Sequence, residues 1–459
     1  MVVTRFLLVS LGMDAILAGA TIHQRRKALH RVANGLGFQD AYSTTLDRIR
    51  QQDGSKSKLG MDALMWLSCC ERPLRLEELR HALGVELGAE DFSINNVPSV
   101  RTILGCTLGL VTIDKSTSTV HLLHLTLHEY LRQHPTPFLT AHSMMAEICL
   151  TYLNYRSLRG LRADLGKVLV TSPFLEYATC FWGAHVGRVV TEPVKSLALR
   201  LLRGYENDAS AAILWRKKIR KWRSEGDVQG ISGLHCIAFW GIAEIAISVL
   251  DMKKWDVNGR DSRGDTPLMW AVRYGNYRVV ELLLKQGDIR PDLVIRDSRT
   301  VFSFAAESGS EPAVKLLLEC GIVNPDSSSS DGRTPLSFAA SGGHEGVVKL
   351  LLERGDVNPN SSDSNDQTPL SYATSMGREG VVKLLSEPRI SNCESLETPD
   401  RMPASAPTPV TAASSPFSLF FLTLILFIFL FFAFSVHYVY LESRVLFHVI
   451  YSAWQWLIN

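Results

Sequence analysis

Apolar and polar positions recur along the second half of the chain at a constant step of 34 residues. The segment 334–340 (TPLSFAA) has in-phase counterparts at 232–235, 266–268, 300–306 and 368–373. A glycine lies seven residues after the leading apolar residue of each copy, and an apolar pair or triplet lies 14 to 16 residues after it. Three matching columns in five copies predict a repeat array.

Each copy predicts a pair of helices. Threonine followed by proline suits a helix start, because the hydroxyl caps the first turn and proline loses no hydrogen bond there. The glycine suits the turn between two helices, where a positive φ is needed. The Val- and Leu-rich second part has the spacing of an amphipathic helix. Since one helix pair cannot bury its apolar face alone, the copies must stack into a solenoid with a continuous core.

This pattern resembles the ankyrin repeat over about residues 227–387. The first copy has Ile237 where the others have alanine, and the last copy breaks off at Pro388. Both departures suit terminal caps, whose outward faces need not accept another repeat. The five copies are expected at 227–260, 261–294, 295–328, 329–362 and 363–387.

The resemblance implies that the concave, hairpin-bearing face binds a protein partner. In ankyrin repeats, contact positions usually fall on the hairpin tips and on the two residues before the inter-helix glycine. The matching positions in this chain are Arg263, Asp265, Arg273, Tyr274, Asp297, Arg299, Glu307, Asp331, Arg333, Asn365 and Gln367. Phe239 and Trp240 fall in the same column of the first copy, and two interpretations remain for them, partner contact or packing on the preceding segment.

One aromatic column lies two residues after each leading apolar position. We interpret it as core rather than as a ladder that binds a partner. The column comprises Trp270, Phe304, Phe338 and Tyr372.

Residues 59–134 follow the order helix, helix, helix, hairpin, helix. The hairpin is predicted by apolar alternation at 110–114 and 119–124, on either side of a polar turn. This order is that of a winged helix. A winged helix that reads DNA should have a basic recognition helix, whereas the third helix here carries only Arg101. We therefore favour a protein-packing module and regard nucleic-acid binding as unlikely.

Four motifs stand out in 59–134, namely 64–67 (LMWL), 72–74 (RPL), 77–79 (EEL) and 124–131 (HLTLHEYL). With them, this half resembles the region that follows the nucleotide-binding domain in fungal NACHT/STAND-type signal-transduction ATPases. Residues 59–134 resemble their winged helix of the GPI inositol-deacylase type, and 135–226 resemble the helical spacer that usually comes next. Residues 1–58 are then a helical remnant following a missing nucleotide-binding domain, although 1–20 also have features of a short signal peptide.

The phosphate-binding Gly-x-x-x-x-Gly-Lys-Ser/Thr loop of those ATPases has no counterpart in the sequence. The nearest segment, 54–57 (GSKS), lacks both the lysine directly after the glycine and the earlier glycine. We therefore do not expect NTP hydrolysis. The chain corresponds to the C-terminal sensing half of such a receptor, either as a fragment of a gene model or as a natural short form.

Composition and motifs do not favour an enzyme. The net charge of the 459 residues is +2, and the eight cysteines form no Cys-x-x-Cys pair, which suggests buried thiols in a reducing compartment. His121, His124 and His128 are expected to be satisfied histidines rather than metal ligands. No nucleophile elbow and no distinctive carboxylate pair occurs, so we expect no catalytic residue, no cofactor, no metal and no small-molecule substrate.

A basic segment at 215–223 lies just ahead of the first repeat, with six cationic residues between and beside two tryptophans. We favour a structural interpretation, in which the segment is a solvated helix that joins the spacer to the repeats. The functional alternatives are an acidic-lipid site, a nuclear import signal, a calmodulin-type target or a nucleic-acid contact. The cationic residues are Arg216, Lys217, Lys218, Arg220, Lys221 and Arg223.

The C-terminal region changes composition twice. Residues 388–416 are rich in Pro, Ser, Thr and Ala and predict a disordered linker. Residues 417–437 begin with an uncharged run of 20 residues, which as a helix would rise about 30 Å and could cross a bilayer. With 438–459 as a short tail, this predicts a single-pass membrane protein whose repeats face the cytoplasm. The alternative is a translated non-coding stretch.

Together the patterns predict a mostly α protein, namely a winged-helix module and helical spacer followed by an ankyrin-repeat solenoid and a C-terminal transmembrane helix. The favoured function is a non-enzymatic protein–protein interaction scaffold or sensor. One alternative is the regulatory fragment of a nucleotide-dependent signalling receptor. A second is nucleic-acid binding through the basic segment.

Overall fold

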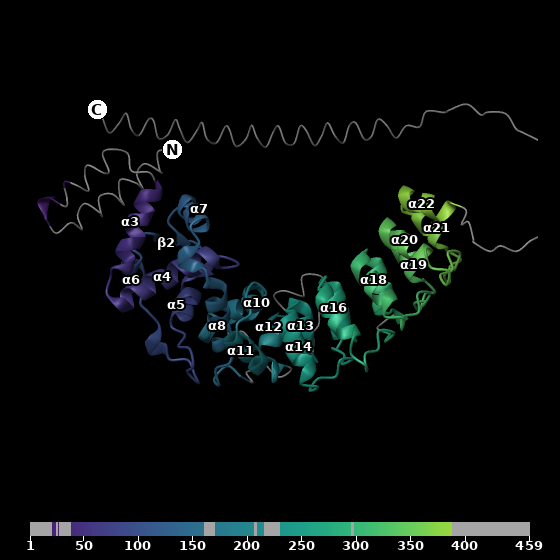
Figure 1. The fold of residues 1–459 in the computed structure, drawn as a ribbon, viewed down its shortest axis with the longest axis horizontal. Coiled ribbons are helices and arrows are strands. Elements are labelled where there is room, and N and C mark those ends of the chain that lie inside the picture. The colour runs from purple at the N-terminus through teal and green to yellow at the C-terminus, as the bar shows by residue number, and fades with distance from the viewer. Residues whose placement is uncertain are drawn as a thin grey trace, which may run out of the picture. The chain divides into compact units, whose positions relative to one another are not determined.

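The computed structural model describes residues 21–23, 26, 38–159, 170–205, 209–214, 230–294 and 298–387. All of them belong to one compact unit, Met1–Pro388. The basic segment 215–223, Asp297, and the linker, span and tail predicted at 388–459 lie outside the described residues. The described part is mostly helical, with one small sheet near its N-terminal end (Figure 1).

The first module combines five helices with a three-stranded antiparallel sheet of order β1-β3-β2. Trp66 and Leu64 on its second helix are fully buried and form the centre of its core. The elements are α3 (Phe38–Arg50), α4 (Gly54–Cys69), β1 (Leu74–Arg75), α5 (Leu76–Leu83), α6 (Val100–Cys106), β2 (Val111–Asp114), β3 (Thr119–Leu122) and α7 (Leu125–Gln133), with short 3-10 turns at Ile94–Asn96 and Thr136–Phe138.

The order of elements expected for residues 59–134 has no strand before the second helix, but residues 74 and 75 form strand β1 there. Leu74 pairs with Val120 and Arg75 with Thr119 on β3. A strand of two residues is too short to show an alternation of apolar and polar positions. The burial of Leu74 is equally compatible with a helix. The residues that follow form α5, whose first turn is fixed by the carboxylate of Glu78 accepting a 2.8 Å hydrogen bond from the Arg75 amide.

Between the first module and the repeats, the described residues of the spacer include four helices. They are α8 (Ala141–Leu153), α10 (Leu175–Val186), α11 (Glu192–Leu202) and α12 (Ala209–Leu214). Aromatic rings join the spacer to the first module, because the Trp66 ring lies 5.5 Å from Phe174 and 5.7 Å from Tyr177, both edge-on. Edge-on ring pairs stabilise a contact beyond the apolar area that they bury. These rings belong to one hydrophobic cluster, so the spacer and the winged helix share one core.

A closed ring of hydrogen bonds seals the same contact. Arg188 Nη1 donates to His142 Nε2 at 2.5 Å, and since an arginine always carries its protons, that nitrogen must be unprotonated. His142 Nδ1–H then donates to His185 Nδ1 at 3.0 Å, and His185 Nε2–H donates to the Tyr177 hydroxyl at 3.0 Å. Glu71 closes the ring, because its amide donates to Tyr177 (3.1 Å) and its carboxylate accepts from Arg188 Nη2 (2.9 Å).

This ring requires both histidines to be neutral. Burial lowers the pKa of His185 to about 3, and the positive charge of Arg188 acts in the same direction, as a charge on His142 would. Burial also lowers the pKa of His142, and Arg188 adds to the effect while Glu71 opposes it. A proton on either ring would place two N–H groups against each other, so protonation is coupled to opening of this contact.

Over the described residues of the repeats, each of the five copies contains two helices. The helix pairs follow one another along the chain (Figure 1). The first helices of consecutive repeats pack on one another, and so do the second helices. The pairs are α13 (Gly233–Trp240) with α14 (Ala243–Asp251), α15 (Pro267–Arg273) with α16 (Tyr277–Leu284), α17 (Val301–Glu307) with α18 (Glu311–Glu319), α19 (Pro335–Gly342) with α20 (Glu345–Leu352), and α21 (Pro369–Ser375) with α22 (Glu379–Ser386).

The predicted helix starts and turns are present. Thr334 accepts a hydrogen bond from the Ser337 amide as the cap of α19, and the other four repeats have the same cap geometry. Gly343 ends α19 with φ of +80°, a conformation that a side chain would strain. The local sequence therefore determines both ends of the first helix in each repeat.

Side chains at one position reach back to the preceding repeat. Asn276 Nδ2 donates to the carbonyls of Ala238 (2.7 Å) and Phe239 (2.9 Å), at the C-terminal end of α13. His344 Nε2 bonds the Glu307 carbonyl at 2.8 Å, and Arg378 bonds the Ser341 carbonyl at 3.3 Å. These bonds satisfy carbonyls that a helix end leaves without partners, and they tie the repeats together at a constant register.

The first repeat is covered by the spacer rather than ending the solenoid. Gly183 on α10 lies so close to Trp240 that an added Cβ would meet its ring at 2.1 Å, and an added Cβ on Gly233 would meet the Leu202 carbonyl at 2.8 Å. Ile237, which the sequence suggested as an outward-facing departure, is fully buried.

The prediction of a membrane-anchored protein with its repeats facing the cytoplasm is corrected. Over the described ranges between residues 21 and 387, no helix has both the length and the apolarity needed to cross a membrane. A span needs about 20 apolar residues, whereas the longest helix in these ranges, α4, has 16. The hydrophobic run at 417–437 that suggested the anchor lies outside the described residues.

Candidate protein-binding surface

Side chains fix the backbone of the hairpin tips that carry the predicted contact positions. Asp261 accepts hydrogen bonds from the amides of Arg263 and Asp265, both at 2.9 Å, and from the indole of Trp270 at 3.2 Å. Burial raises the pKa of Asp261, and the nearby Asp265 adds to this effect. The tip of the second repeat is therefore held in one conformation before any partner arrives.

The fifth repeat repeats this arrangement. Asp363 accepts from the amides of Asn365 and Gln367 at 2.9 Å, and from the Tyr372 hydroxyl at 2.5 Å. The hydrogen bond from Tyr372 lowers the pKa of Asp363. Sequence analysis did not single out the two aspartates, although their separation of three repeat steps could have identified them.

The predicted contact residues differ in exposure. Asp265 is buried, with 4 % of its surface exposed, so it supports the tip from inside rather than presenting its carboxylate. The exposed predicted positions are Glu307, Asp331, Asn365 and Gln367. The half-buried ones are Arg263, Arg273, Tyr274, Arg299 and Arg333.

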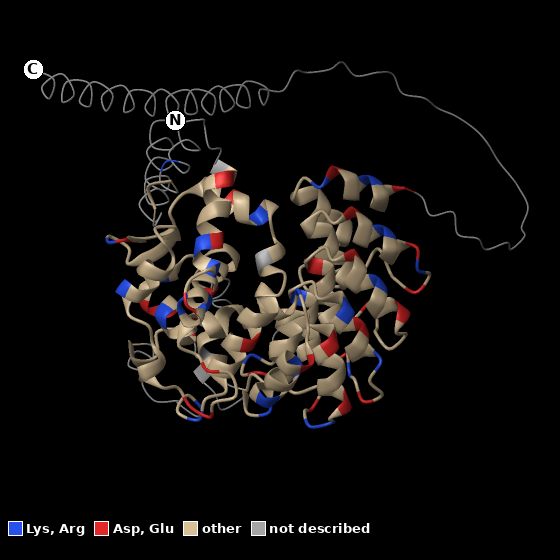
Figure 2. Cartoon of the chain, turned by 60° about the vertical axis from the view of Figure 1, so that its left-hand side comes forward, with Lys and Arg blue, Asp and Glu red and all other residues tan. Residues whose placement is uncertain are grey.

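The structure pairs predicted positions that are eight residues apart within a repeat. Arg273 contacts Asp265 at 2.5 Å, between the end of α15 and the hairpin before it. Arg299 and Glu307 form the same kind of ion pair in the next repeat. Each pair joins one cationic and one acidic side chain, so the surface carries charges of both signs. Figure 2 shows cationic and acidic residues interspersed along the repeats.

Three of the arginines lie over rings of the aromatic column. The Arg273 guanidinium is 4.9 Å from the centre of the Phe304 ring. Arg299 and Arg333 lie 4.4 and 4.2 Å from the Phe338 ring, and Arg333 is also 4.3 Å from the ring of Tyr372 (three contacts in one stack). Cation–π contacts of this kind hold a guanidinium in place while its edge still offers hydrogen bonds.

The aromatic column is thus partly core and partly surface. Trp270 and Phe338 are 1 % and 5 % exposed, which fits the core interpretation. Phe304 and Tyr372 are half-buried, and an arginine guanidinium lies over each ring, while Phe304 also packs against the hydrophobic core. The sequence pattern could not distinguish these cases because the four residues occupy one position of the repeat.

Phe239 and Trp240 belong to different contacts. The Trp240 ring lies 6.1 Å from Trp182 of the spacer, consistent with the packing interpretation of this residue. Phe239 lies 4.6 Å from Tyr274, edge-on, within the row of predicted contact positions. Only Phe239 therefore extends that row into the first repeat.

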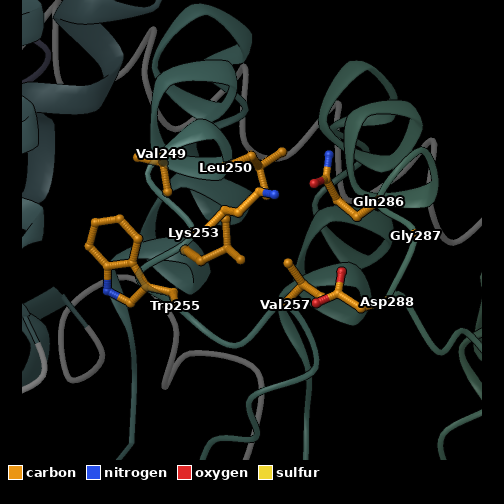
Figure 3. Close-up of a pocket in the computed structure, with 9 residues that line it drawn as sticks. Val249, Leu250, Lys253, Trp255, Val257, Gln286, Gly287 and Asp288 are labelled. Carbon is orange, nitrogen blue, oxygen red and sulfur yellow. The ribbon is translucent and has the colours of Figure 1, made fainter.

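A separate cavity of about 330 Å³ lies between the first two repeats (Figure 3). It is formed by the ends of the second helices and the loops after them, and it contains none of the predicted contact residues. Apolar and charged side chains both line it. Its lining includes Val249, Leu250, Lys253, Trp255, Val257, Gln286 and Asp288.

Two of the three histidines that were considered as metal ligands have structural partners, namely His121 and His124. His124 caps α7 by accepting a hydrogen bond from the Thr126 amide at 3.2 Å. His121 Nε2 bonds the Thr119 hydroxyl at 2.6 Å on the same strand. Among the residues placed by the structure, no three His, Cys, Asp or Glu side chains form a group that could hold a metal ion.

Comparison with known families agrees with this architecture. Residues 198–297 and 302–395 match the family described as ankyrin repeats (3 copies). The solenoid is an ankyrin-repeat domain. Residues 46–143 match the winged helix domain of the GPI inositol-deacylase type, and no NACHT domain is among the matches. No curated protein matches the chain. The ankyrin match begins in α11, so it includes the last spacer helices as well as the five repeats.

Proposed function

We propose that the chain is a non-enzymatic interaction scaffold whose ankyrin hairpin tips and first-helix ends bind a protein partner. The supporting observation is the row of tips whose backbone is fixed from within, by Asp261 in the second repeat and Asp363 in the fifth. A preorganised surface loses little conformational entropy when it binds. The ankyrin match supports protein binding in general, and the individual contact residues are part of this proposal.

Site-specific photo-crosslinking tests the proposal. A photoreactive amino acid replaces Asp331 or Asn365 at the tips and, as matched controls, Lys315 or Glu353 on the second helices, all four being exposed. In cells that express the full chain, we expect a discrete protein adduct from the tip positions and none of the same mass from the controls. Adducts that form equally from both faces, or only from the second helices, would place the partner elsewhere.

The alternative function is the regulatory part of a nucleotide-dependent signalling receptor. It is supported by the match to the winged helix and by the hydrogen-bonded ring that joins this module to the spacer through Glu71 and Arg188. Titration of the purified chain with fluorescent ATP and GTP analogues distinguishes it from a plain scaffold. Saturable binding favours the receptor, and its absence favours the scaffold.

Nucleic-acid binding through 215–223 remains the least supported proposal. That segment lies outside the described residues, and helix α6, which would be the recognition helix of a DNA-binding winged helix, has Arg101 as its single cationic residue. Salt-dependent DNA affinity that disappears when Lys217 and Lys218 become alanine would support this function.

A further inference from the structure

One pairing site recurs in successive repeats and is left incomplete in the fourth. The two positions of the site are eight residues apart, at the end of the hairpin and at the end of the first helix. In the second repeat they hold Asp265 and Arg273, and in the third Arg299 and Glu307, each joined as an ion pair. The fourth repeat has Arg333 opposite Ser341, a residue without charge.

The guanidinium of Arg333 is held in place but is not neutralised. It lies between the rings of Phe338 and Tyr372, at 4.2 and 4.3 Å. Nη2 donates to the Ser341 hydroxyl at 2.9 Å and to the Ser337 carbonyl at 3.4 Å. Nε is buried without a partner, as it is in Arg299 as well. The difference from Arg299 lies at the outer nitrogens, because Nη1 of Arg333 makes no hydrogen bond and no carboxylate of the described chain lies within 4 Å of Arg333 as an ion-pair partner.

The nearest acidic residues have other partners. Asp363 accepts from Tyr372 and from two backbone amides, although the charge of Arg333 still contributes to its lowered pKa. Asp331 accepts a hydrogen bond from Ser329. Neither carboxylate takes the place that Glu307 occupies beside Arg299 in the preceding repeat.

A carboxylate is the group that completes such a site. The two rings cover the faces of the guanidinium, so a ligand must approach in its plane, where Nη1 and Nη2 form a fork that matches two carboxylate oxygens. The guanidinium is already immobilised by stacking, so a ligand would not have to order it. A phosphate would also match the fork, but the two preceding repeats complete the same site with carboxylates.

We propose that Arg333 receives an aspartate or glutamate side chain from an acidic segment of the protein partner, at the position that Glu307 fills in the repeat before it. This inference rests on the proposed function, because it assigns one recognition contact to the same surface. Arg299 is the matched control, since it also lies over the Phe338 ring but already has Glu307 as its carboxylate.

A displayed library of random 12-residue peptides, selected against the full chain, provides the probes. We expect the selected peptides to share an Asp or Glu, whose replacement by Gln weakens binding to the wild type roughly 10- to 100-fold in fluorescence anisotropy. With Arg333→Met, which keeps an apolar side chain between the rings, the same replacement should change the affinity less than about twofold. With Arg299→Met, the acid-to-amide effect should stay as large as in the wild type.

The outcomes separate this inference from the broader function. Peptides that bind the tips without a required acid, or whose acid effect survives in Arg333→Met, would refute the role of Arg333 and leave the binding surface intact. Peptides that still bind when Asp331 and Asn365 are both replaced by bulky tryptophan would contradict the proposed surface itself, as would a library that yields no binder. Circular dichroism melting of each variant verifies that it is folded.

Discussion

Acid should weaken the contact between the winged helix and the spacer, because folding keeps His185 neutral. A histidine in the unfolded chain has a pKa of about 6.5, whereas burial lowers the pKa of His185 to about 3 in the folded protein. The contribution to stability is therefore fully present above pH 6.5 and is lost as the pH falls below that value. At pH 5 the unfolded state has bound about one more proton than the folded state.

The magnitude follows from these two pKa values. Between pH 7.5 and pH 5.0, the difference in protons bound to this histidine in the unfolded and folded states, integrated over pH, is about 1.5. At 1.36 kcal/mol per pH unit, this lowers the free energy of unfolding by about 2 kcal/mol. His185 has no exposed surface, so solvent screening does not reduce this figure. His235, also fully buried and with its pKa lowered to about 4, contributes in the same direction.

Urea unfolding of the full chain at both pH values, followed by tryptophan fluorescence, measures the effect. In His185→Gln the loss of stability between pH 7.5 and 5.0 should be smaller than in the wild type by about 2 kcal/mol, because glutamine binds no proton. His134→Gln, at an exposed position after α7, is the control and should behave as the wild type. Equal losses in the wild type and in His185→Gln would refute the coupling between the ring and protonation.

Three substitutions test packing, charge burial and capping. Gly183→Ala would place a methyl group 2.1 Å from a tryptophan ring of the first repeat, and should lower the free energy of unfolding by about 1–3 kcal/mol in urea, whereas Gly204→Ala, with no atom nearby, should cost less. Glu78→Ala should destabilise by about 3 kcal/mol in the same assay, since it leaves a half-buried arginine without its two-pronged 2.7 Å contact, and Glu77→Ala on the exposed face should change little. Thr334→Ala removes a helix cap and should cost about 1 kcal/mol; an unchanged urea midpoint would show that the cap does not contribute.

The repeats could be predicted from the sequence because each local feature has one structural meaning. The 34-residue step determined the helix pairs, Thr334 and its counterparts determined the helix starts, and Gly343 determined a turn that needs positive φ. Strand β1 was missed because Leu74 and Arg75 owe their strand conformation to pairing with β3, which lies more than 40 residues further along the chain.

The chemistry of the surface was only partly predictable. The hairpin positions were identified by their column, but the column could not show that Asp265 is buried while Asn365 is exposed. Nor could it show that Arg299 and Arg333 both lie over the Phe338 ring, because Arg299 belongs to the third repeat and Arg333 to the fourth. Contacts between repeats depend on how the units stack, and one unit's sequence does not specify that geometry.

The close approach of Gly183 to Trp240 has a consequence for how the chain can be divided. A shortened protein that starts at residue 227 would expose the indole of Trp240 and the apolar face of α13 to solvent. This exposed apolar surface would promote association between copies of the fragment. A fragment that keeps α10 and α11 would instead retain its own N-terminal lid. The spacer thus shields the apolar N-terminal end of the solenoid from water, a role that the polar outer face of a terminal repeat usually has.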